Sequence, residues 1–71
     1  MTVERYRLSP REAEVLGYWA SGYPSPFIEK KLFISKSTVK THLTHIYGKT
    51  GTSNRQSLLE LLDALEEEAR S

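Results

Sequence analysis

The amino-acid sequence predicts an all-α protein, a compact domain of four helices. In four segments the apolar residues recur at helical spacing, and each segment follows a serine or asparagine that can cap a helix. No segment shows the alternation of a strand, and the sequence has no internal repeat or low-complexity tract. A chain of 71 residues is long enough for one core only, and that core is thin.

The first helix is predicted over residues 10–20. Ser9 can cap it, Pro10 suits the first helical position, and Glu12 stands at the third, where it completes a capping box. Gly22 follows as a stop signal. We therefore interpret Glu12 as a capping and salt-bridge residue. The buried stripe of this helix consists of Val15, Leu16, Trp19 and Ala20.

A second, shorter helix is predicted over 26–32, with Ser25 as its cap and a proline directly after it. Ile28 and Leu32 lie four residues apart and point inward. A turn at 33–34 leads to the next helix. Two helices joined by so tight a turn form a helix-turn-helix. The predicted fold is therefore a four-helix compact domain that contains this motif.

The third helix is predicted over 36–50, between the cap Ser35 and the stop Gly51, and it has two different faces. One face is mostly apolar and consists of Val39, Leu43, Ile46 and Thr50. The opposite face is small and polar, with Ser37, Lys40, Thr41, Thr44 and Gly48. That face has no acid, whereas a merely solvated face usually mixes Glu with Lys. A helix that docks on a core and lies in a DNA groove needs this combination.

The fourth helix is predicted over 55–68, with Ser53 or Asn54 as its cap. It carries five leucines at helical spacing, and Leu59 is the one that widens the stripe. One face of a small domain rarely needs so many, which favours pairing with the same helix of a second copy. The candidate dimer interface consists of Leu58, Leu61, Leu62 and Leu65. Packing of all five leucines on the first helix is the alternative and stays open.

Charge is segregated along the chain. Residues 1–59 carry nine Lys or Arg against four acids, and residues 60–71 carry one Arg against five acids. From Lys30 to Arg55 there are six basic residues and no acid. The first part would attract a polyanion and the end would repel it. A soluble domain with a solvated acidic helix end would show the same pattern.

Several motifs together resemble the LuxR-type (GerE-like) helix-turn-helix domain. They are Leu8-Ser9-Pro10-Arg11-Glu12-Ala13-Glu14-Val15-Leu16, Ala20-Ser21-Gly22, Ile34-Ser35, Thr38-Val39-Lys40-Thr41-His42, Lys49, Gly51 and Asn54-Arg55. The resemblance covers about residues 8–62. It implies a DNA-binding domain that regulates transcription, with its third helix in the major groove and its fourth helix pairing two protomers. It also implies the C-terminal output domain of a longer regulator, such as a response regulator.

The expected boundaries are a flexible N-terminal segment at 1–7, the LuxR-type domain at 8–66 and an acidic C-terminal tail at 67–71. Some positions depart from the family pattern. Ser25-Pro26-Phe27-Ile28-Glu29 stands where Asn-Lys-Glu-Ile-Ala is common. Glu29 must therefore point outward, pair with a basic group or open the angle between the two helices. Thr50 and Thr52 replace Leu and Val, which trims the core.

Three residues are the candidate base contacts, by helical phase and by their match to the family's base-facing positions: Lys40, Thr41 and Thr44. Lys40 can donate to guanine O6 or N7, the Thr41 methyl can touch a thymine methyl, and the short Thr44 can read bases weakly or through water. The hydroxyl of Thr41 can also bond a base edge. The candidate phosphate contacts are Lys36, Ser37, Thr38, His42, Lys49 and Arg55.

No enzyme or cofactor site is predicted. The sequence has no nucleophile elbow, no Gly-rich phosphate loop and no cysteine. His42 and His45 are three residues apart, but no third ligand at suitable spacing accompanies them, so no metal site is expected. With no long apolar stretch and no signal peptide, we expect a cytoplasmic segment without membrane contact.

The expected partners are double-stranded DNA, a second copy through the fourth helix, and RNA polymerase. The alternative function is a protein-interaction module that has lost specific DNA binding, with the fourth helix, Pro26-Phe27 and Glu29 as its contact surface. A sigma-factor-like domain shares the Leu-Ser-Pro-Arg-Glu motif, but the Thr-Val-Lys-Thr-His motif fits it poorly.

Overall fold

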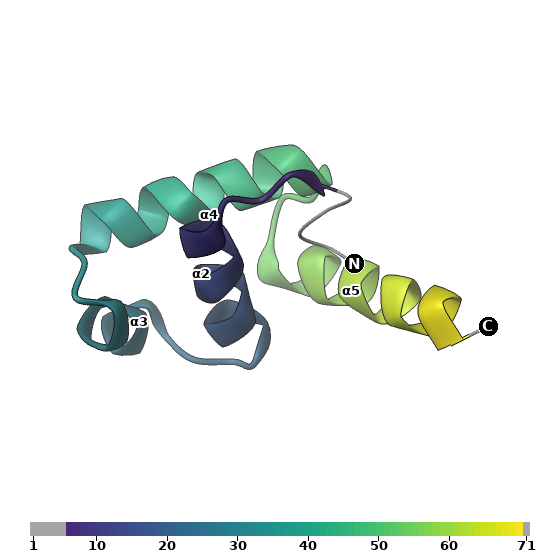
Figure 1. Cartoon of the computed structure of the whole chain (residues 1–71), viewed down its shortest axis with the longest axis horizontal. Coiled ribbons are helices and arrows are strands. Elements are labelled where there is room, and N and C mark those ends of the chain that lie inside the picture. Colours follow the sequence, from purple (N-terminus) through teal and green to yellow (C-terminus); the bar gives the residue numbers. More distant parts are fainter. Residues whose placement is uncertain (1–5, 71) are drawn as a thin grey trace.

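The structure, a computed structural model, describes residues 6–70 and confirms the predicted all-α fold. Its helices are α2 (Pro10–Ala20), α3 (Ser25–Leu32), α4 (Lys36–Thr50) and α5 (Arg55–Arg70). In Figure 1, α4 runs along the top of the molecule, α2 descends beneath its middle and α3 lies beneath its beginning. The last helix, α5, leaves this group and extends toward one end of the molecule.

The predicted caps of three helices are confirmed. At α2, Ser9 Oγ accepts a hydrogen bond from the Glu12 N–H at 3.2 Å, and Glu12 Oε1 accepts one from the Ser9 N–H at 3.0 Å, which completes the capping box. Ser35 Oγ caps α4 through the Thr38 N–H at 3.1 Å. Of the two candidates at α5, Asn54 is the cap, because its Oδ1 accepts from the Ser57 N–H at 2.8 Å.

The start of α3 differs from the prediction. The helix begins at Ser25 rather than after it, and Pro24 occupies the cap position with an extended backbone and no side-chain cap bond. The Ser25 hydroxyl is instead donated to Glu29 Oε2 at 3.0 Å. Glu29 is half-buried and accepts this bond, so it does not point freely outward. The helix ends at Leu32, and the C-cap residue Phe33 that follows has a left-handed backbone with a φ of 55°.

The two ends of the chain also differ from the expected boundaries. Helix α5 continues two residues past 68 to Arg70, because Glu and Ala are good helix formers and nothing there stops it. The tail expected at 67–71 is thus helical over 67–70. Of the segment expected at 1–7, residues 1–5 lie outside the described part. Tyr6 packs against the core, and the Arg7 carbonyl accepts a hydrogen bond from Lys49 at 3.1 Å.

The core lies where α2, α3, α4 and the first turns of α5 meet. Its fully buried side chains are Val15, Ile28, Val39, Ile46 and Leu58. Thr50 is buried beside them, and its hydroxyl is donated to the Ile46 carbonyl at 2.8 Å. A threonine is tolerated here because its polar atom is satisfied within its own helix. Among the described residues, no helix is both apolar enough and long enough to cross a membrane.

Candidate nucleic-acid interface

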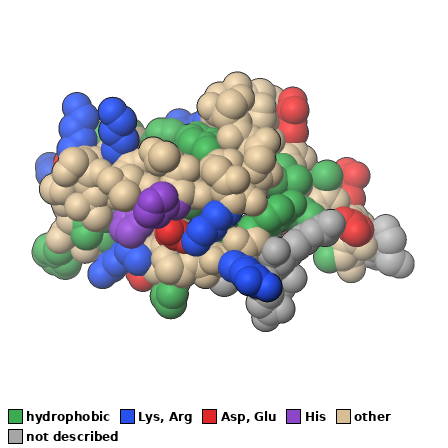
Figure 2. Space-filling model, turned by 90° about the horizontal axis from the view of Figure 1, so that it is seen from above, with side chains coloured by type: hydrophobic (Ala, Val, Ile, Leu, Met, Phe, Trp, Pro, Cys, Tyr) green, Lys and Arg blue, Asp and Glu red, His purple; other side chains and the backbone are tan. Residues whose placement is uncertain are grey.

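The outer face of α4 is defined here by Ser37, Lys40, Thr41, Thr44 and Gly48. All five are exposed, whereas Val39, Ile46 and Thr50 on the opposite face are buried. The predicted phase of this helix is therefore confirmed. Figure 2 looks onto the side of the molecule that carries α4, where small polar side chains and backbone dominate. Lys and Arg lie at one end and also near the histidines in the middle of the view, and acidic side chains gather mainly at the opposite end, formed by α5.

The two threonines of the outer face direct their hydroxyls into the helix. Thr41 Oγ1 donates to the Ser37 carbonyl at 2.9 Å, and Thr44 Oγ1 donates to the Lys40 carbonyl at 2.9 Å. Each bond spans one helical turn. A hydroxyl has a single proton, so both oxygens can accept a further hydrogen bond but have no donor left. The methyl groups are unaffected by this pairing.

The start of α4 holds a compact group of hydroxyls. Ser35 Oγ lies 3.1 Å from Ser37 Oγ and 2.9 Å from Thr38 Oγ1. The Thr38 hydroxyl therefore helps to stabilise the start of the helix, and Thr38 is half-buried. Ser37 and Lys36 are exposed. The free backbone N–H groups of a first turn favour an anion, and these side chains surround that position.

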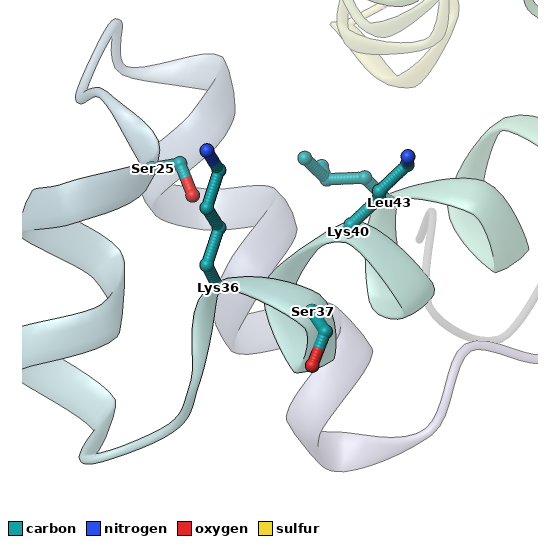
Figure 3. A pocket seen from close by; sticks show the side chains of 5 residues that line it. All are labelled: Ser25, Lys36, Ser37, Lys40 and Leu43. Atoms are coloured by element: carbon teal, nitrogen blue, oxygen red, sulfur yellow. The ribbon is translucent and has the colours of Figure 1, made fainter.

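A hollow of about 480 Å³ lies between the start of α3 and the first half of α4. It is lined by Ser25, Lys36, Ser37, Lys40 and Leu43, and its walls are mostly apolar. Figure 3 shows Lys36, Lys40 and Leu43 extending to the same side of α4, near Ser25, while the Ser37 hydroxyl points to the other side. The lysine stems and Leu43 therefore form an apolar wall beneath two cationic ends. Sequence reasoning missed Ser25 here because it was assigned to a cap.

The other flank of α4 is tied to the beginning of α2. Glu12 is only 5% exposed, and its carboxylate accepts from Lys49 Nζ at 2.6 Å and lies 3.1 Å from His45 Nδ1. The Lys49 hydrogen bond, followed by that of the Ser9 N–H, lowers the pKa of Glu12 from its ordinary 4.5 to about 2, against the effect of burial. His42 is half-buried on this flank, and its buried Nδ1 has no hydrogen-bond partner among the described residues.

Arg55, a predicted phosphate contact, is held by the protein itself. Its guanidinium carbon lies 3.5 Å from the centre of the Trp19 ring, and its Nη2 donates to the Tyr23 carbonyl at 3.1 Å. The indole N–H of Trp19 in turn donates to Tyr47 Oη at 2.8 Å. This group joins α2, α4 and the start of α5. Sequence reasoning placed Trp19 in the core but gave no signal for its two polar partners.

The leucines of α5 divide into two groups. Leu58 is fully buried and belongs to the core, so its prediction as a dimer contact is corrected: it has no surface to offer a partner. Leu62 is half-buried and packs against the core. Leu59, Leu61 and Leu65 are also half-buried. The part of α5 that carries Leu61 and Leu65 lies beyond the helix group in Figure 1.

Comparisons with known proteins agree on one family. The model of the bacterial regulatory proteins of the luxR family matches residues 6–62. The oxygen regulatory protein NreC of Staphylococcus aureus is 45% identical over 53 residues, which are 75% of this chain and 24% of that protein. HTH-type transcriptional regulators of Mycobacterium bovis and Mycobacterium tuberculosis are 42% identical over 53 residues, 75% of this chain and 6% of theirs. No solved structure matches the chain.

Proposed function

We propose, because this chain belongs to the luxR family of bacterial regulatory proteins, that it recognises a specific sequence of double-stranded DNA through the outer face of α4. DNA binding in transcription regulation is the function of the domain. The observation that carries the finer proposal is the outer face itself: it is exposed over its whole length, has no acid, and has Lys40 at its edge. Such a surface can enter a major groove without repelling phosphates.

The base contacts we propose are Lys40, Thr41 and Thr44. Lys40 is exposed beside the hollow, and its ammonium group can donate to guanine O6 or N7. The two threonines stand on the same face, three residues apart, where their side chains lie one above the other.

The phosphate contacts we propose are of two kinds. Lys36, Ser37 and Thr38 surround the start of α4, where a phosphate would meet the free N–H groups of the first turn. Lys49 and Arg55 already bind protein groups, but an ammonium has three donors and a guanidinium five. Both therefore keep N–H groups for a phosphate. His42 completes the set from the flank that faces α2.

We propose further that two copies bind together through α5. The support is the amphipathic helix that extends past the core with Leu61 and Leu65 on it, and Leu62 at the edge of the core. A twofold pair would place two copies of α4 about one DNA turn apart, so the bound site would be an inverted repeat.

The chain spans a quarter or less of the length of the relatives named above. We therefore propose that it acts as the output domain of a longer cytoplasmic regulator, in which further domains supply the signal. Contact with RNA polymerase is part of this proposal, because a bound regulator must act on transcription.

The test is selection of bound duplexes from a random DNA pool at moderate salt, with Lys40→Ala in parallel. We expect an inverted repeat, with one base position blurred in the variant. Recovery of no common sequence, with binding that depends on salt alone, would contradict specific recognition.

A protein-interaction module is the second candidate, and the exposed rings of Tyr23 and Phe27 favour it. It is distinguished by a loss of even weak, salt-dependent affinity for random duplexes.

A further inference from the structure

The hydroxyl groups of Thr41 and Thr44 set a limit on what the outer face of α4 can read. Each is donated to a carbonyl of its own helix at 2.9 Å. An oxygen held in this way lies against the backbone of the preceding turn. Each side chain can then offer a base only its methyl group or an acceptor oxygen, and no donor, and both residues are exposed.

The neighbouring hydroxyls are engaged as well. Ser37 Oγ and Thr38 Oγ1 both lie within hydrogen-bond distance of Ser35 Oγ. The cationic ends of Lys36 and Lys40 add charged donors along this part of α4, on the side of the hollow. Together, the lysines offer charged donors and the two threonines offer methyl groups.

We infer that Thr41 and Thr44 are specificity-determining residues that recognise the 5-methyl groups of two neighbouring thymines through their own methyl groups. This inference rests on the proposed function of α4. A thymine methyl is the only apolar group that a base edge presents in the major groove. Residues three apart on a helix are separated by about 4.5 Å along its axis, close to the spacing of about 3.4 Å between successive base pairs. Two methyl contacts can therefore fall on adjacent or nearly adjacent thymines.

The experiment uses the duplex selected by the wild-type chain. Each thymine of one half-site is replaced in turn by deoxyuridine, which lacks only the methyl group, and affinity is measured by fluorescence anisotropy. We expect two positions at which uracil weakens binding about fourfold, the value for burial of one methyl-sized group. In Thr41→Ser one of these positions loses its response to uracil, and in Thr44→Ser the other does. Thr41→Val and Thr44→Val keep the methyl and keep the response.

Thr52→Ser is the matched control. It removes a methyl group from the connector between α4 and α5, where the Thr52 hydroxyl contacts Thr50, and should leave both uracil responses as in the wild type. Circular dichroism of each variant shows whether the helices are retained.

Three results overturn the inference alone: a selected site without a uracil-sensitive thymine, a uracil response that persists in both serine variants, or valine variants that lose discrimination while the serine variants keep it. The last would mean that the hydroxyls read the bases. If the wild-type chain selects no sequence at all, the proposed function fails first and this inference with it.

Discussion

The indole N–H of Trp19 donates a hydrogen bond to the hydroxyl of Tyr47, 2.8 Å away. The two residues stand 28 positions apart in the chain and join the end of α2 to the last turns of α4. Arg55 lies over the face of the same indole ring at 3.5 Å. The Trp19 ring therefore helps to hold α4 against α2 and the start of α5.

Tyr47→Phe removes the acceptor and leaves the partly buried indole N–H unpaired. We expect the free energy of unfolding to fall by about 1–2 kcal/mol, the range for a lost hydrogen bond that strands its partner. Urea denaturation followed by circular dichroism measures this. Tyr23→Phe removes a hydroxyl from an exposed ring and serves as the control. Equal stability of the two variants would contradict the role of the Trp19–Tyr47 bond.

Glu12→Gln tests the link between α2 and α4. Glutamine can still complete the capping box, so the change removes chiefly the charge that Lys49 and His45 meet. At neutral pH we expect a loss of about 1–3 kcal/mol in unfolding free energy, because a charge-assisted bond is replaced by weaker ones. Glu14→Gln is the matched control. Glu14 is exposed, and its ion pair with Arg11, at 3.7 Å, lies on the surface, so its loss should change the free energy of unfolding little.

The same residue predicts a pH dependence. The pKa of Glu12 is lowered from 4.5 to about 2, so the unfolded chain takes up a proton at higher pH than the folded one. The stabilisation is therefore complete above about pH 4.5 and is lost as the pH falls toward 2. Melting temperatures measured across this window should converge for the wild type and Glu12→Gln at the acid end. A gap that stayed constant would exclude the carboxylate as its cause.

Lys40→Ala should weaken binding to the selected duplex by about 1–3 kcal/mol and relax the preference at one base position. The reason is that Lys40 is exposed at the edge of the outer face, where its ammonium group can reach a base. Anisotropy titrations on the selected site and on its single-base variants provide the measurement. Uniform weakening on every duplex would instead place Lys40 on a phosphate.

Lys36→Ala and Lys49→Ala should differ in stability although both remove a cation. Each is expected to reduce the slope of log affinity against log salt by about one. Only Lys49→Ala should also lower the unfolding free energy, because Glu12 then keeps a buried charge without its 2.6 Å partner. Salt titrations and urea denaturation of both variants separate the two effects. Loss of stability in Lys36→Ala would contradict its position as a free surface cation.

The double change Leu61→Glu, Leu65→Glu tests pairing through α5. We expect binding to a two-half-site duplex to weaken on the order of a hundredfold, because the second binding event is no longer intramolecular. Binding to a single half-site should be retained. Ala64→Glu adds a charge at an exposed position of the same helix and is the control.

Leu58→Ala, in contrast, should lower the free energy of unfolding by about 2–5 kcal/mol, since it leaves a cavity at a fully buried core position.

The helices and their faces could be predicted because their signals are local. The capping box at Ser9 and Glu12 lies within four residues, and the buried face of α4 follows from spacing alone. The same logic failed at Ser25, where two local solutions compete. Pro24 already holds the extended backbone of a cap position, so the Ser25 hydroxyl is free to bind Glu29.

The candidate site could be predicted in its outer face but not in its flanks. Lys49 meets Glu12 across 37 positions, and Arg55 meets the Trp19 ring across the whole helix-turn-helix. Neither pairing has a periodic signal, because each depends on how the helices pack. The left-handed backbone of Phe33 also escaped prediction: such positions favour glycine, and here the chain places a 93% exposed aromatic residue in one.

The absence of acidic residues from the outer face of α4 has a consequence for how such a domain would search a chromosome. At this face a wrong sequence would be rejected not by repulsion but because it does not offer groups that match Lys40 and the threonine methyls, as proposed above. The domain would bind any duplex weakly, slide along it, and remain longest where its few favourable contacts occur together. Such binding would depend strongly on salt, and its sequence specificity would increase with the proposed pairing of two copies.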